Sequence, residues 1–130
     1  MPLCILGGGK VVTLAVAGFS LAWTHTIERI PWEEYWRVEP GQLVLEESRI
    51  KGSGAGMEPA PDARLVDGWF VWQPNETRKN IVLRRAPEAG DWRICPRHES
   101  GEQGPCQPLG AIMDTDPVIL KPCDLPAPAE

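Results

Sequence analysis

The segment from Phe19 to Val38 constrains the fold most, because two stretches of it alternate with a period of two. In a β-strand this period places alternate side chains on opposite faces. The two stretches therefore predict two antiparallel strands that form a hairpin, with one face buried and the other in water. The predicted inner face carries Phe19, Leu21, Trp23, His25, Ile27, Trp32, Glu34, Trp36 and Val38.

The predicted register of this hairpin places His25 opposite Glu34 and Trp23 opposite Trp36. A slip by one residue would mix the two faces, so the alternation favours this pairing. A histidine beside a carboxylate suits acid–base chemistry, a metal or a small ligand, or a buried pair that fixes the register. We expect the pair to organise the domain first and to bind a ligand second.

The remaining chain also predicts strands, because 14 prolines and 13 glycines divide it into short pieces. A length of 130 residues suits one domain with one core. We expect an all-β fold, a single antiparallel β-sandwich or partly open barrel over residues 1–121, followed by a proline-rich tail over 122–130. Asp67-Gly68 predicts a tight hairpin turn, whereas 73–79 is expected to be a polar loop.

Charge and motifs argue against several functions. A net charge of −5 without a basic stripe argues against nucleic-acid binding. No apolar stretch reaches the roughly 20 residues of a membrane span, and residues 3–17 are expected to be two strands rather than a cleaved signal peptide. The glycine-rich stretch 51–57 lacks the order of a phosphate-binding loop, and no serine has the nucleophile-elbow context. We therefore expect no cofactor and no catalysis.

The four cysteines, Cys4, Cys95, Cys106 and Cys123, lack the spacing of a metal site, so no metal is expected. Cys95 and Cys106 flank a loop rich in glycine and proline and are expected to form a disulfide. Cys4 and Cys123 could tie the two termini together. Disulfides imply an oxidising compartment, whereas free buried thiols in a cytosolic protein are the alternative.

The aromatic strand with Trp23-Thr24-His25-Thr26, the cluster Glu33, Glu34 and Trp36, and the stretch 54–57 (GAGM) together carry a resemblance. Over roughly residues 3 to 95 the chain resembles a family of small bacterial proteins of unknown function. Genes of that family often lie beside TAXI-type TRAP transporters, the tripartite ATP-independent periplasmic uptake systems.

The resemblance implies a transport-associated context and no mechanism. We expect a non-catalytic accessory or binding partner of TRAP transporter subunits, located in the periplasm or cell envelope. A cytoplasmic location is the alternative. The alternative function is a small-ligand or metal-binding domain with a His/Glu site. The candidate ligand-binding residues are His25, Glu34, Glu33, Gly54, Gly56 and Met57.

Overall fold

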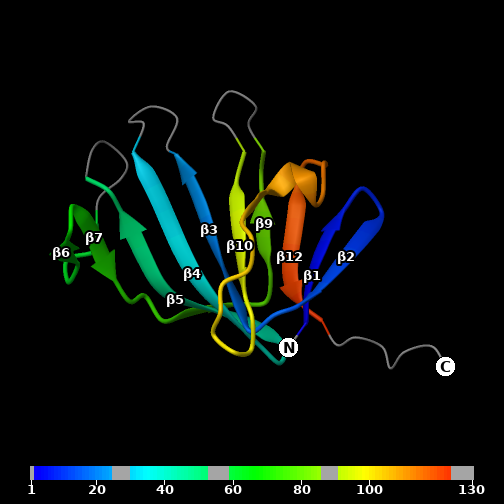
Figure 1. The fold of residues 1–130 in the computed structure, drawn as a ribbon, viewed down its shortest axis with the longest axis horizontal. Helices are drawn as coiled ribbons and strands as arrows, with labels where there is room; N and C mark the ends of the chain where they lie inside the picture. Colours follow the sequence, from blue (N-terminus) through cyan, green and yellow to red (C-terminus); the bar gives the residue numbers. More distant parts are fainter. Residues whose placement is uncertain (1, 25–29, 53–58, 86–90, 124–130) are drawn as a thin grey trace.

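The computed structural model describes residues 2–24, 30–52, 59–85 and 91–123. The described residues form β-strands and one short 3-10 helix, arranged as two antiparallel sheets (Figure 1). Neither sheet closes into a barrel in the described part of the chain, so the prediction of an all-β sandwich is confirmed. Among the same residues, no helix is long and apolar enough to cross a membrane.

The smaller sheet has the strand order β2-β1-β12-β9 and joins the first residues of the chain to the last described ones. Its first two strands are the two that the sequence predicted over residues 3–17, with a turn at Gly8 and Gly9, both at positive φ. The predicted domain boundary at residue 122 lies at the end of its last strand. The strands are β1 (Pro2–Gly7), β2 (Lys10–Ala15), β9 (Ile81–Leu83) and β12 (Val118–Pro122).

The larger sheet has the order β11-β10-β3-β4-β5-β7-β6, with β8 also paired to β5. The predicted hairpin is β3–β4, and the Asp67-Gly68 turn joins β6 to β7, with φ angles of 51° and 86°. The elements are β3 (Gly18–Thr24), β4 (Pro31–Glu39), β5 (Gln42–Ile50), β6 (Arg64–Val66), β7 (Trp69–Trp72), β8 (Glu76–Arg78), β10 (Arg93–Arg97), β11 (Gln107–Pro108) and the 3-10 helix η2 (Leu109–Ala111).

Both predicted disulfides are present. Cys4 of β1 is bonded to Cys123, which directly follows β12, and Cys95 of β10 is bonded to Cys106. None of the four cysteines is free. Disulfides of this kind are typical of proteins from oxidising compartments.

The core lies between the two sheets. Alternate residues of β3, β4 and β5 face alternate residues of β1 and β12, as the period-two pattern requires. The side chains below 2% exposure are all aliphatic, and each contributes about 1.5–3 kcal/mol through burial. They are Leu3, Ile5, Leu21, Leu43, Ile50, Ile94, Leu109, Val118 and Leu120.

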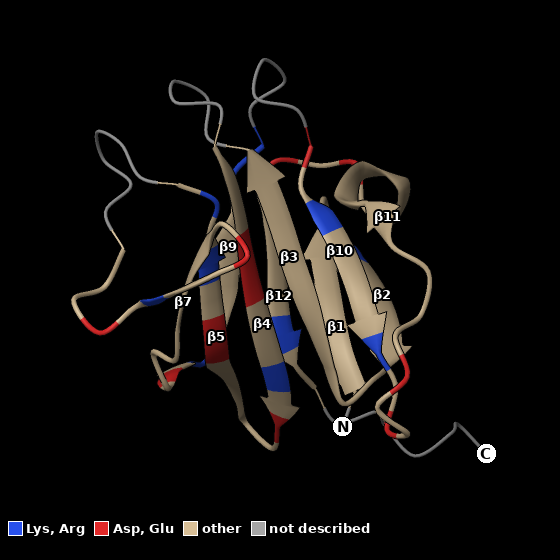
Figure 2. Cartoon of the chain, turned by 60° about the vertical axis from the view of Figure 1, so that its left-hand side comes forward, with Lys and Arg blue, Asp and Glu red and all other residues tan. Residues whose placement is uncertain are grey.

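The opposite face of the larger sheet is polar, with charges paired within strands and between them. Arg37 contacts Glu39 at 2.7 Å and Glu46 at 2.5 Å, and Arg49 contacts Glu47 at 2.6 Å. Figure 2 shows that β4 and β5 carry both acidic and basic residues, whereas the neighbouring β3 carries neither. For the described residues of β3 and β4, the assignment of the two faces by alternation is therefore correct.

Candidate functional site

The core opens toward one end of the sandwich into a cavity of about 520 Å³. We name it the inter-sheet cavity, because β3, β4, β5 and β7 of the larger sheet and β9 of the smaller one all contribute to its lining. Its volume falls within the range of small-molecule sites. Five of the six tryptophans line it, namely Trp23, Trp32, Trp36, Trp72 and Trp92.

The pairing of strands explains why these side chains meet. One row across β3, β4, β5 and β7 runs through Leu21, Glu34, Ser48 and Trp72. The cross-strand partners in this row share one face of the sheet, so all four side chains point toward the core.

A β-bulge opposite Tyr35 and Trp36 sets which residues of β5 line the cavity. Trp36 pairs with Leu45, but Tyr35 pairs with Glu47, so β5 contains one extra residue. Without this extra residue, the side chains that follow Leu45 would alternate regularly between the two faces, and Glu47 would point inward. The bulge instead places Ser48 beside Glu34 and leaves the acidic side chain of Glu47 outside.

The tryptophans form a continuous aromatic wall. The ring centroids of Trp92 and Trp23 are 4.4 Å apart, those of Trp23 and Trp32 are 5.4 Å apart, and those of Trp32 and Trp72 are 6.2 Å apart. Aromatic pairs at these distances attract each other beyond the effect of buried area. The wall is therefore held in place by ring contacts between strands and not by single side chains.

Glu34 is the acidic residue of this wall. It is half-buried between Trp32 and Trp36, and the indole Nε1–H of Trp36 donates to its Oε1 at 3.1 Å. Burial raises the pKa of Glu34, although the Trp36 hydrogen bond acts in the opposite direction. In the described part of the chain, no lysine or arginine forms a salt bridge with it.

Two more charged residues, Glu76 and Arg78 of β8, line the cavity where it meets solvent. They pair with each other, with Arg78 Nη2 2.7 Å from Glu76 Oε2, and both side chains are about half exposed. The sequence predicted a polar loop here. That prediction was wrong for residues 76–78, because Leu43, Val44 and Leu45 of β5 offer them a free strand edge.

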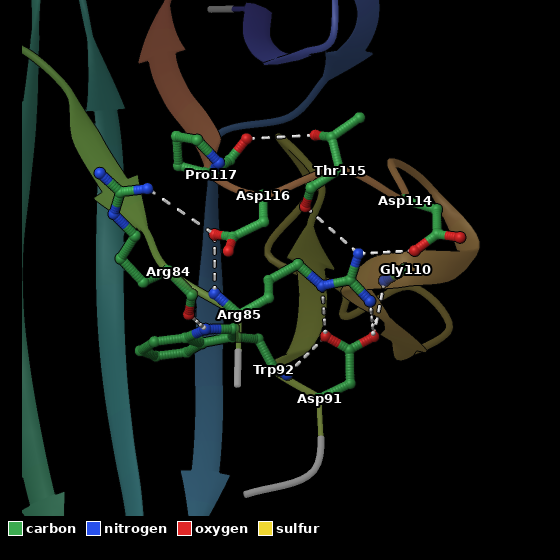
Figure 3. Close-up of polar contacts among 9 residues, drawn as sticks. All are labelled: Arg84, Arg85, Asp91, Trp92, Gly110, Asp114, Thr115, Asp116 and Pro117. Carbon is green, nitrogen blue, oxygen red and sulfur yellow. Dashed lines mark hydrogen bonds and ion pairs between the residues drawn. The ribbon is translucent and has the colours of Figure 1, made fainter. Parts of the chain in front are cut away.

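Trp92 closes the end of the aromatic wall and makes three hydrogen bonds, one of them accepted by its carbonyl oxygen from the N–H of Leu109 at 2.7 Å. Its indole Nε1–H donates to the carbonyl oxygen of Arg84 at 2.9 Å, and its backbone N–H donates to Oδ1 of Asp91 at the same distance (Figure 3). The ring therefore bridges the chain just beyond β9 to the chain just before β10.

An ionic cluster around Arg85 joins this region to η2 and to the start of β12 (Figure 3). The guanidinium contacts Asp91 at 3.2 Å and Asp114 at 2.8 Å. Gly110 lies against it, donating its N–H to Asp91 at 2.7 Å, and an added Cβ would lie 2.5 Å from Arg85 Nη2. A side chain at position 110 would displace the guanidinium, so this contact requires glycine.

The predicted His25–Glu34 pairing was wrong. Glu34 pairs with Leu21 and Trp23 with Trp32, a slip of the hairpin that keeps both faces intact. The observed register forms two aromatic cross-strand pairs, Phe19–Trp36 and Trp23–Trp32, where the predicted one offered a single pair.

The structure does not bring all of the predicted site residues together at one site. Glu34 lines the inter-sheet cavity, whereas Glu33 lies on the opposite face and accepts a hydrogen bond from the Tyr35 hydroxyl at 3.0 Å. No group of three His, Cys, Asp or Glu side chains suited to a metal occurs among the described residues. The other candidates, His25, Gly54, Gly56 and Met57, lie outside the described residues.

The sequence reasoning missed most of the cavity. Trp72, Trp92 and Ser48 come from segments far apart in the sequence, and only the pairing of β5 and β7 and the position of β9 bring them together. The sequence did contain one indication of this cavity, namely six tryptophans together with a carboxylate at an inward-facing position of β4.

The comparisons with known proteins place the chain in a family. Searches of curated proteins and of solved structures each found no match. Residues 19–101, which include every strand of the larger sheet except β11, match the family described as Domain of unknown function (DUF1850). The match covers more than half of the 130 residues, and the chain therefore belongs to this family.

Proposed function

We propose that the protein is a non-catalytic binding protein that holds a small organic ligand in the inter-sheet cavity. The observation that carries this proposal is the cavity itself, about 520 Å³ in volume and lined by five tryptophans, by the half-buried carboxylate of Glu34 and, at its rim, by Glu76. Concave sites with aromatic walls and few polar groups are typical of small-molecule binding. Among the described residues, Ala22, Glu33 and Arg93 of the opposite face contribute to a smaller hollow of about 300 Å³.

The wall is suited to holding a ligand because it is rigid before the ligand arrives. Ring contacts join Trp92, Trp23, Trp32 and Trp72 in series, and hydrogen bonds fix the ring of Trp92. A preformed site loses little conformational entropy on binding.

The first test is the response of the six indole N–H signals in a ¹H–¹⁵N NMR spectrum. We expect benzylammonium, benzyl alcohol or benzoate, added separately, to shift signals of the cavity tryptophans. Trp69 is an internal control, since it is not among the lining residues and instead has the Lys51 Nζ 5.7 Å from its ring centroid. Equal shifts at Trp69 and at Trp32, or no shift with any probe, would contradict a cavity site.

We further propose that the ligand-binding protein works as an accessory of a TAXI-type TRAP uptake transporter in the cell envelope. The resemblance carried by residues such as Trp23 and Glu34 supports this context, and the two disulfides fit an oxidising compartment.

We expect tagged protein, expressed in a bacterium that encodes the neighbouring transporter, to co-purify with its subunits. A variant with the cavity intact but the polar face altered, Arg37→Ala, tests which surface is used, because Arg37 lies opposite the cavity side. Absence of every transporter subunit from the purified material would count against the association and leave the cavity proposal standing.

A further inference from the structure

We infer that the ligand of the inter-sheet cavity carries a positively charged ammonium group, for which Glu34 is the counter-ion and the tryptophan rings are the surrounding wall. The inference rests on the proposed function, since it names the chemical class of the ligand for the same site. It follows from the charges that line the cavity, the groups that surround Glu34 and the type of aromatic residue present.

The charges that line the cavity do not balance. Glu34, Glu76 and Arg78 are the charged lining residues among those described, and Arg78 is already paired with Glu76 at 2.7 Å. Ionised Glu34 therefore has no cationic partner of its own. A charge that is removed from water without a partner is costly, so an incoming cation is favoured over an anion.

The side chains that surround Glu34 are mainly the indole rings of tryptophans. Trp36 donates one hydrogen bond to Oε1, and Trp32 and Trp36 flank Glu34 on the same strand face. Tryptophan is the aromatic side chain that attracts cations most strongly through its π-system. A carboxylate together with several tryptophans is the combination that recognises substituted ammonium ions.

Few groups in the cavity suit an anionic ligand. The Nε1–H of Trp32 has no acceptor among the described residues, but the atom is buried. The guanidinium of Arg78 is engaged by Glu76, and its side chain is about half exposed at the rim. Positive potential at the centre of the cavity is therefore weak.

Binding of a cation is coupled to the ionisation of Glu34. Burial holds the pKa of this carboxyl above its ordinary value, with Trp36 and Arg78 opposing the rise and Glu76 adding to it. A cation stabilises the ionised form, so binding of an ammonium ion lowers the pKa of Glu34. Affinity for the cation therefore rises with pH until Glu34 is ionised in the free protein.

The test compares three probes of similar size and different charge, benzylammonium, benzyl alcohol and benzoate, by NMR titration of the indole signals. We expect benzylammonium to bind about ten-fold or more tightly than benzyl alcohol, with benzoate weakest. Glu34→Gln should remove this preference. Glu33→Gln should keep it, because this matched control removes the same charge from the opposite face of β4.

A second measurement needs no variant. Affinity of the unmodified protein for benzylammonium should fall as the pH is lowered, whereas affinity for benzyl alcohol should change little. Equal affinity for all three probes, or a preference that survives Glu34→Gln, would overturn the ammonium inference and leave the cavity proposal intact. No response to any probe would instead overturn the cavity proposal itself.

Discussion

Replacing both Cys4 and Cys123 by alanine is expected to lower the free energy of unfolding by about 5 kcal/mol. The two residues are 119 positions apart, so their disulfide closes a loop that contains nearly the whole chain. A loop of this length restricts the unfolded chain strongly, and removing the cross-link returns that conformational freedom. In the folded state the bond also joins β1 to the residue that directly follows the adjacent strand β12.

The matched comparison is the Cys95→Ala/Cys106→Ala variant. Its disulfide spans only 11 positions, so we expect a loss of about 3 kcal/mol by the same argument. Urea denaturation of both variants and of the unmodified protein, with and without a reducing agent, measures these losses. Equal losses for the two variants would show that loop length does not decide the contribution.

The sequence was sufficient to predict the fold class and the disulfides for physical reasons. Glycine and proline limit the length of each strand, and alternation fixes which side chains enter the core. The prediction that Cys4 and Cys123 tie the termini together required only that the first and last strands lie close. Pairing of Leu3 with Pro122 in β1 and β12 produces that proximity.

Alternation could not determine the register of the β3–β4 hairpin. Any slip that preserves parity keeps Phe19, Leu21 and Trp23 on the inner face, so it leaves the hydrophobic pattern unchanged. The pairing of Trp23 with Trp32 selects among these registers. That choice depends on how the aromatic rings pack, and the alternation of side chains along a strand gives no information about ring packing.

The candidate site was even less predictable from sequence than the register. A bulge in β5 turns Ser48 inward, and pairing with β7 brings Trp72 into the same row. Both events depend on contacts between segments distant in the chain. Glu34 was selected through its predicted pairing with His25, which the observed register does not form, whereas its true neighbours could be found only in three dimensions.

Trp36→Ala is expected to lower the free energy of unfolding by about 3–5 kcal/mol, the range for removing a large aromatic core residue. Only 4% of Trp36 is exposed, and its ring stacks on Phe19 with a centroid distance of 6.4 Å. Alanine would leave a cavity beside Phe19 and would also remove the hydrogen bond to Glu34.

Trp36→Phe separates these two effects, because phenylalanine keeps most of the ring but cannot donate to Glu34. The hydrogen bond lowers the pKa of Glu34, so its loss should raise that pKa further above the ordinary value of 4.5. A carboxyl with a raised pKa favours the folded state most at low pH, below its value in the unfolded chain. This contribution is lost as the pH rises through the folded-state pKa.

The destabilisation caused by Trp36→Phe should therefore be larger at pH 7 than at pH 4, by about 1–3 kcal/mol for a hydrogen bond to a charged group. Thermal or urea unfolding at the two pH values measures the difference. In the double variant Trp36→Phe/Glu34→Gln the pH-dependent part should disappear, since glutamine does not ionise. A pH-independent loss in the single variant would mean that Trp36 stabilises the protein by packing alone. In that case Glu34 would depend on other groups to ionise within the inter-sheet cavity.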